Sequence, residues 1–199
     1  QEVPISVQAE LELIANRLKQ PQLGRVDGRF PVYVIFSTRR GLRTQYGEEA
    51  AGKLEKSMQH MASEVRKRKG WGGLVFFGDE GLAIPGTDLL ASLSDRPARS
   101  NDAWSLKLSL ADLDAALGKQ GEMIGAVLIV GGPEVVPFHH LPNPVDDADP
   151  DVPSDNPYAT RDENYFIPEW PIGRLPGGVG SDPSLILGSL HEFTRLHED

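Results

Sequence analysis

The sequence predicts an α/β fold whose mostly parallel sheet carries helices on both faces. Three apolar runs, at 31–37, 74–77 and 124–130, lack the alternation of a half-solvated strand. Continuous apolar runs of this length are typical of strands that are buried on both faces. Helical patterns separate the runs, and such alternation requires crossover connections, so we expect the three strands to lie parallel in one sheet.

The chain is predicted to divide into an N-terminal helix with its linker, residues 1–28, and one α/β unit, residues 29–199. A length of 199 residues suits a single domain with its own core. The N-terminal helix is predicted over residues 5–20. Its apolar residues are spaced 4, 3 and 4 apart, as on one helix face: Val7, Leu11, Ile14 and Leu18.

The longest helix is predicted from about Gly47 to Lys69, ahead of a stop signal at Gly70. The preceding stretch, 38–46, is polar and basic and shows no clear pattern. The basic run 66–69 complements the negative end of the helix dipole, which accounts for it without a binding partner. The apolar stripe of the helix consists of Ala50, Leu54, Met58, Met61 and Val65.

Two further helices are predicted in the second half of the chain. One spans 109–118, with Ser109 as its N-cap and Asp112 three residues on. Between residues 80 and 107 only a short helix near Leu89 is indicated. The last helix starts at Asp182-Pro183, because Asp at the cap and Pro in the first turn are strong start signals. Ile186, Leu190 and Phe193 are expected on one face of this helix.

A long Pro- and Asp-rich loop is predicted at 133–170. Ten of the 16 prolines fall between 133 and 176, and residues 146–163 contain seven acidic side chains and one basic one. Long loops inside compact domains are often functional. Alternating carboxylates at Asp147, Asp149 and Asp151 suggest a calcium site, although Val152 and Tyr158 stand where an EF-hand needs Gly and Glu. The alternative is a solvated acidic loop without a metal.

Composition and motifs exclude several function classes. The net charge of −9 disfavours nucleic acid as a partner, and no apolar stretch approaches the length that would make a membrane a partner. The chain has no cysteine, hence no thiolate nucleophile, and no targeting pattern that would assign a compartment. Gly131-Gly132 lacks the spacing of a phosphate loop and is predicted to be a tight turn. The histidines, including His139-His140, lack zinc spacing and are expected on the surface or in loops.

One ion pair is predicted directly. Arg174 stands in Gly-Arg-Leu-Pro with apolar neighbours, and a buried guanidinium requires a partner. Asp155, in the Pro-rich loop, is the expected bidentate partner. This pair would join the loop to the sheet.

Three segments together resemble the gingipain-type, caspase-like cysteine peptidases. They are Val127-Leu-Ile-Val-Gly-Gly-Pro-Glu-Val-Val-Pro137, Ser154-Asp-Asn-Pro-Tyr158 and Trp170-Pro-Ile-Gly-Arg-Leu-Pro176. That family shows an apolar strand ending in Gly-Gly or Gly-Asp with a nearby Val/Ile-Pro, then Ser-Asp-x-x-Tyr, then Ile/Val-Gly-Arg, in this order. Residues 32–47 also look like the front of bacterial relatives. The resemblance covers most of residues 30–197.

The resemblance implies a caspase-like three-layer sandwich that forms the N-terminal, non-catalytic half of an endopeptidase. The catalytic His, usually followed by Gly, and the catalytic Cys lie further along in that family, and neither motif occurs here. The implied partners are a catalytic half, on the same or a processed polypeptide, and a protein substrate; calcium binding is also a property of gingipains. The residues that match the family's structural signature are Gly131, Gly132, Ser154, Asp155, Tyr158, Gly173 and Arg174.

Other functions stay open at this point. The main alternative is a non-catalytic α/β interaction or regulatory domain derived from the same superfamily. A receiver domain would need paired acids after the first strand, where residues 37–40 are Ser-Thr-Arg-Arg. A complete metal-dependent hydrolase is disfavoured, because no ligand spacing for it is present.

Overall fold

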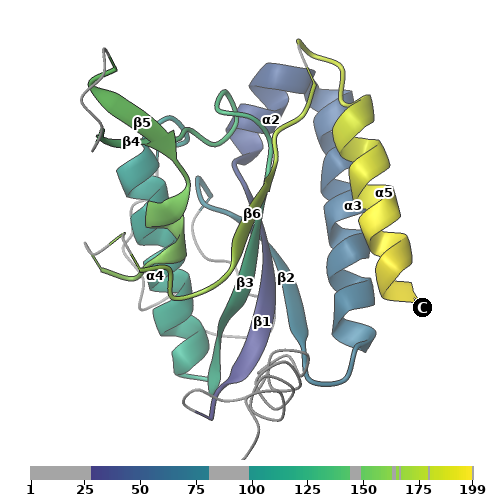
Figure 1. The fold of residues 1–199 in the computed structure, drawn as a ribbon. Helices are drawn as coiled ribbons and strands as arrows, with labels where there is room; N and C mark the ends of the chain where they lie inside the picture. The colour runs from purple at the N-terminus through teal and green to yellow at the C-terminus, as the bar shows by residue number, and fades with distance from the viewer. Residues whose placement is uncertain are drawn as a thin grey trace, which may run out of the picture.

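The fold contains a four-stranded parallel sheet with strand order β2-β1-β3-β6 (Figure 1). Its strands are β1 (Phe30–Ser37), β2 (Gly72–Phe77), β3 (Glu122–Val130) and β6 (Ile172–Leu175). The computed structural model describes residues 28–80, 99–143, 149–162, 165, 167–178 and 180–198. The expected mostly parallel α/β architecture is confirmed. The helices predicted at 5–20 and near Leu89 lie outside the described residues.

Helices cover both faces of the sheet. α3 (Glu48–Lys67) and α5 (Ser184–Glu198) pack side by side on one face, and α4 (Ala103–Gly118) covers the other (Figure 1). β1 lies between β2 and β3, and its consecutive residues Val34, Ile35 and Phe36 have no exposed surface. The absence of alternation in the sequence therefore reflects burial on both faces.

The stretch 38–46, which shows no clear pattern in the sequence, contains a helix, α2 (Arg39–Tyr46). The Asp79 carboxylate, just beyond β2, accepts the backbone N–H groups of Arg39 and Arg40 at 2.8 and 2.9 Å. This contact satisfies the first turn of the helix from a residue that is distant in the sequence. Gly47, with φ of 82°, then separates α2 from α3. In the predicted stripe of α3, Leu54, Met58, Met61 and Val65 are buried, and Ala50 is partly buried.

The predicted start of α4 at Ser109 is wrong, since the helix begins at Ala103. Asp102 is the N-cap, and its Oδ1 accepts the N–H groups of Trp104 and Ser105 at 3.1 and 3.2 Å. Trp104 and Leu108 are 49% and 59% exposed, so the first two turns lack a polar outer face. Because the first turns are only weakly amphipathic, the spacing of apolar residues does not predict where the helix starts.

The start signals of α5 are confirmed within two residues, since Asp182 accepts the Ser184 N–H at 3.0 Å. The three residues predicted on one face of α5 differ in burial. Ile186 and Leu190 are buried, whereas Phe193 is 37% exposed and Thr194 takes the buried place. The Thr194 hydroxyl donates to the Leu190 carbonyl at 2.7 Å, which satisfies it inside the helix interface.

The segment 133–170 is more ordered than the loop predicted there. It contains an antiparallel hairpin, β4 (His139–Pro142) with β5 (Asp151–Ser154), and a short 3₁₀ turn, η2 (Asn156–Ala159). β6 follows as a fourth parallel strand that the sequence pattern does not indicate, because a four-residue strand with a central glycine has no apolar run. In the described part of the chain, no helix has the length and apolarity needed to cross a bilayer.

Candidate functional site

Arg174 on β6 forms the predicted ion pair with Asp155. Its Nε and Nη2 donate to the two carboxylate oxygens of Asp155 at 2.8 and 2.5 Å, so the pair is bidentate. The side chains of Arg174 and Asp155 are 7% and 19% exposed. The predicted connection between the Pro-rich segment and the sheet is therefore confirmed.

The same guanidinium reaches a third segment, the turn after β3. Arg174 Nη1 donates to the carbonyl oxygens of Gly131 and Val136, each at 2.8 Å, and the group lies 4.4 Å from the centre of the Phe138 ring. One side chain thus joins β6, the turn at 131–136 and the segment after β5. A guanidinium presents several donors in a fixed plane, which lysine could not reproduce.

The Gly131-Gly132 pair forms the tight turn that was predicted. Gly131 has φ of 120°, and a Cβ built there would lie 2.5 Å from Cβ of Val135. A Cβ on Gly132 would lie 2.8 Å from the Pro176 carbonyl oxygen. The Gly132 carbonyl accepts the N–H groups of Val135 and Val136, which closes the turn. Both glycines are required for backbone geometry rather than for a ligand.

Tyr158, on η2, contacts the segment that follows the turn at 131–136. It has no exposed surface, its hydroxyl donates to the Pro137 carbonyl at 2.7 Å, and burial raises its pKa well above the ordinary value. Ser154 Oγ accepts the Asn156 N–H at 3.1 Å and supports the start of η2. Gly173, by contrast, is exposed with open space around it, and no contact explains it. Gly173 is paired with Leu128 in the sheet, but this backbone pairing does not require a glycine. The other six signature residues have contacts that account for the residue type.

The calcium hypothesis for Asp147, Asp149 and Asp151 stays a prediction. Asp147 lies outside the described residues, and Asp151 Oδ1 lies 2.7 Å from His140 Nδ1. Among the residues that the structure describes, no group of three or more His, Asp or Glu side chains could hold a metal ion.

His139 contradicts the expectation of a surface or loop histidine. It is 2% exposed, and its ring lies edge-to-face against Trp104 and Tyr158, with centroids 4.8 and 4.6 Å away. Neither ring nitrogen has a hydrogen-bond partner among the described residues. Burial, and secondly the Lys107 ammonium group, lower the pKa of His139 to about 4. His140, the next residue, is exposed as predicted.

Two buried charges on α4 have no counterpart among the predicted sites. Lys107 is 2% exposed, and its Nζ donates to the carbonyls of Thr160 and Asp162 at 3.0 and 2.6 Å. Asp114, one heptad further, accepts the Ile124 N–H at 2.8 Å and Arg161 Nε at 2.6 Å. Lys107 and Asp114 are seven residues apart, which places both on the inner face of the helix. This spacing is the sequence signal that could have identified them as buried charges.

The crevice between the carboxyl ends of β1 and β3 is closed. Ligands of open parallel sheets usually bind where strand order reverses, which here is between these two strands. Ser37 Oγ donates to the Val130 carbonyl at 2.7 Å, and Thr38 Oγ1 donates to the Val135 carbonyl. A Cβ on Gly41 would lie 2.6 Å from the same Val135 oxygen. The chain itself therefore fills the usual ligand position.

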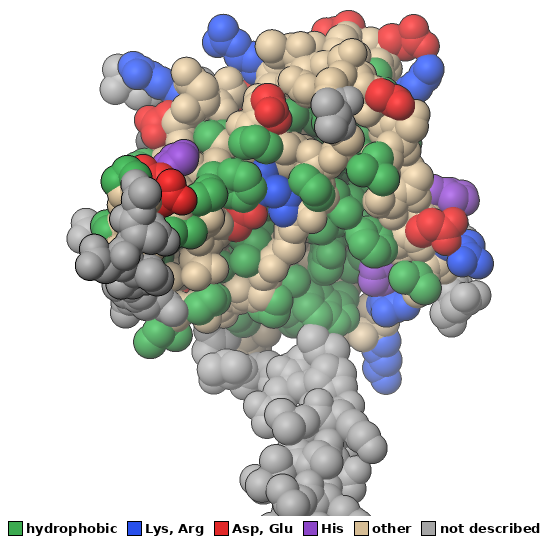
Figure 2. Space-filling model, turned by 45° about the horizontal axis from the view of Figure 1, so that its top comes forward, with side chains coloured by type: hydrophobic (Ala, Val, Ile, Leu, Met, Phe, Trp, Pro, Cys, Tyr) green, Lys and Arg blue, Asp and Glu red, His purple; other side chains and the backbone are tan. Residues whose placement is uncertain are grey.

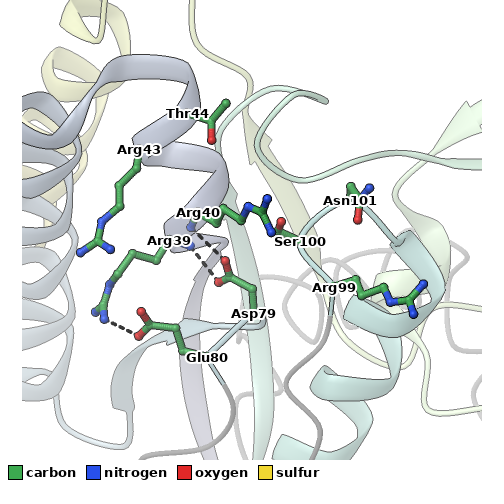
Figure 3. Close-up of a pocket in the computed structure, with 9 residues that line it drawn as sticks. All are labelled: Arg39, Arg40, Arg43, Thr44, Asp79, Glu80, Arg99, Ser100 and Asn101. Carbon is green, nitrogen blue, oxygen red and sulfur yellow. Dashed lines mark hydrogen bonds and ion pairs between the residues drawn. The ribbon is translucent and has the colours of Figure 1, made fainter.

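A pocket of about 660 Å³ opens one strand further along this edge, and we call it the arginine pocket (Figure 3). The sequence marks it only by basic residues directly after a buried strand. Arg39 pairs with Glu80, and with Glu55 at 2.7 Å. The lining residues are Arg39, Arg40, Arg43, Thr44, Asp79, Glu80, Arg99, Ser100 and Asn101.

Comparisons with known proteins assign no family. No family model matches the chain, and no curated protein or solved structure shows significant similarity to it.

Proposed function

We propose that this chain is the N-terminal scaffold half of a caspase/gingipain-like cysteine endopeptidase. The catalytic His and Cys would lie on another segment of the same polypeptide or on a separate chain. One observation carries the proposal: motif residues up to 43 positions apart converge on Arg174 and hold the ends of β3 and β6 together. Residues that match the peptidase motifs thus have structural contacts, as expected of a supporting half.

The chemistry of the residues present is consistent with a scaffold that does not itself catalyse peptide cleavage. A peptidase of this class needs a thiolate activated by a histidine, and the chain contains no cysteine. The residues around Arg174 form what we call the Arg174 cluster: Gly131, Val136, Asp155, Tyr158 and Arg174. His139 packs against Tyr158 of this cluster, but it is enclosed by aromatic rings and stays neutral near pH 7. At 2% exposure it has almost no accessible surface from which to exchange a proton with a substrate.

The open edge of the sheet supports a protein partner. Among the described strands, β6 pairs with β3 alone, so its outer backbone groups lie at the edge of this sheet. Ile172 and Leu175 on this strand are only partly buried. Figure 2 shows hydrophobic side chains gathered in the middle of this side of the molecule, with charged side chains mostly around the rim. An unpaired strand beside apolar surface favours association with a second α/β layer, which the catalytic half would supply.

The alternative, a non-catalytic interaction domain, is favoured by the outer face of α5. Leu185, Phe193 and Leu196 are 57%, 37% and 59% exposed along this face. Leu185 and Phe193 border a shallow groove of about 350 Å³ that also includes Gly188. An exposed apolar row of this kind is typical of a protein-binding surface, which needs no catalytic residues.

Sequencing of the gene beyond codon 199 and labelling with a peptidyl acyloxymethyl ketone, an irreversible probe of cysteine peptidases, distinguish the two functions. The peptidase proposal expects a downstream or neighbouring segment with His-Gly and an apolar run ending in Cys. It also expects labelling of the full gene product or its partner, and none of the 199-residue chain. The proposal would be contradicted if neither this reading frame nor a neighbouring gene encodes such a segment and no labelling is seen. That result would favour the interaction domain.

A further inference from the structure

Most polar groups on the inner wall of the arginine pocket are paired within the chain, although Arg39 Nε is buried and has no hydrogen-bond partner among the described residues. Asp79 accepts both N-terminal amide groups of α2, and Arg39 pairs with two glutamates while its guanidinium stacks 4.4 Å over the Phe77 ring. Arg43 Nε lies 3.1 Å from a Glu48 carboxylate oxygen. These groups shape the pocket but hold little unbalanced charge.

The opposite side of the pocket carries donors that have no partner among the described residues. Figure 3 shows Arg40 extending from α2 toward Ser100 and the turn before α4, whereas Arg39 and Arg43 extend the other way. Arg99, in the turn before α4, also lines the pocket, but Figure 3 shows its side chain extending away from Arg40, so the two guanidinium groups lie apart. Neither guanidinium group has a partner among the described residues, in a chain whose net charge is −9. Within the described ranges, five lining side chains make no hydrogen bond or ion pair: Arg40, Thr44, Arg99, Ser100 and Asn101.

The geometry favours carboxylates over phosphate as the ligand. Phosphate sites commonly use free backbone N–H groups at a helix N-terminus. At α2 these groups are already bound by Asp79. The two uncompensated guanidinium groups come from different elements, α2 and the turn before α4, and each can bind a carboxylate in bidentate fashion. A pocket of about 660 Å³ lies within the size range of specific ligand sites.

We propose that the arginine pocket is a docking site for an acidic peptide segment of a partner protein, with Arg40 and Arg99 each binding one carboxylate. Thr44, Ser100 and Asn101 supply further donors to the peptide. The site is independent of the proposed peptidase role, because none of its residues belongs to the Arg174 cluster.

The probes are fluorescein-labelled peptides in which two aspartates are separated by one, two or three glycines. Binding is measured by fluorescence anisotropy at low and at high salt, with the Asn analogue of each peptide as the neutral reference. We expect at least one acidic peptide to bind and its affinity to fall with salt, because exposed charge pairs are screened. Binding by the Asn analogue at equal affinity would overturn the proposal.

The variants Arg40→Gln and Arg99→Gln locate the site. Each is expected to weaken binding roughly tenfold, and the double variant to abolish it, because each removes one charge-assisted bidentate contact. Arg195→Gln on α5 is the matched control, since Arg195 is also exposed and pairs locally with Glu192. Both pocket arginines are exposed, so unchanged circular dichroism is expected.

Three results would overturn the proposal: no acidic peptide binds, the double variant binds as well as the wild type, or inorganic phosphate binds more tightly than every peptide. The last result would reassign the pocket to a phosphorylated ligand. None of these outcomes depends on peptidase activity, so the docking site and the proposed function fail separately.

Discussion

His139 should make the stability of this protein fall steeply between pH 6.5 and about pH 4. The imidazole is 2% exposed, and Trp104 on α4 and Tyr158 on η2 pack against it. Burial and the Lys107 ammonium group disfavour its protonated form, while the carboxylates of Asp155 and Asp102 only partly offset them. The folded chain therefore resists a proton that the unfolded chain accepts.

The size of the effect follows from the two pKa values of His139. It is about 4 in the folded chain and near the ordinary 6.5 in the unfolded one. Above pH 6.5 the imidazole is neutral in both states and contributes nothing to pH dependence. As the pH falls, only the unfolded state binds the proton, so the free energy of unfolding decreases by about 1.4 kcal/mol per pH unit, to a total of about 3 kcal/mol.

Urea unfolding followed by tryptophan fluorescence at closely spaced pH values measures this dependence. His139→Leu, of similar volume, should lose the His139 contribution, so the free-energy gap between variant and wild type changes by about 3 kcal/mol across the range. His140→Gln, at the exposed neighbouring position, should keep the wild-type slope. Parallel pH curves for the wild type and His139→Leu would refute the reasoning.

Three further variants, one of them with a control, test the Arg174 cluster, the turn at Gly131 and the N-cap of α4 by the same urea assay. Arg174→Met should lower the free energy of unfolding by about 3 kcal/mol or more, because it leaves the Asp155 carboxylate and two carbonyls without their donor; a loss below 1 kcal/mol would contradict this role. Gly131→Ala should cost about 2 kcal/mol or more, since φ is 120° and the new Cβ meets Val135, whereas Gly173→Ala, in open space, should stay within about 0.5 kcal/mol. Asp102→Ala should cost about 1 kcal/mol through loss of the α4 cap; no change would mean that the cap contributes nothing.

Part of the Arg174 cluster was predictable from the sequence. An arginine between apolar neighbours requires a partner, and Asp155 was the expected one. The additional bonds of Arg174 to the carbonyls of Gly131 and Val136 were not predictable, because any backbone carbonyl can accept a hydrogen bond. Only the packing of the turn at 131–136 against β6 selects these two.

The arginine pocket and α2 depend on contacts that no local pattern contains. Asp79 caps the first turn of α2 from a position 40 residues away in the sequence. The turn that carries Arg99 lies directly before α4 and lines the same pocket. The start of α4 is not visible in the apolar periodicity, because Trp104 and Leu108 are apolar but exposed.

The sequence by itself determined the alternation of helices and strands, the parallel sheet and the buried stripe of α3. These features follow from the period of apolar residues along the chain, which is a local property. Only the tertiary structure decided which polar groups are buried, such as His139 and Lys107, and which cations lack a partner among the described residues, such as Arg40. It also decided that β6 forms the edge of the sheet. Burial and charge pairing depend on residues that the fold brings together from distant positions, so a pattern read along the chain does not contain them.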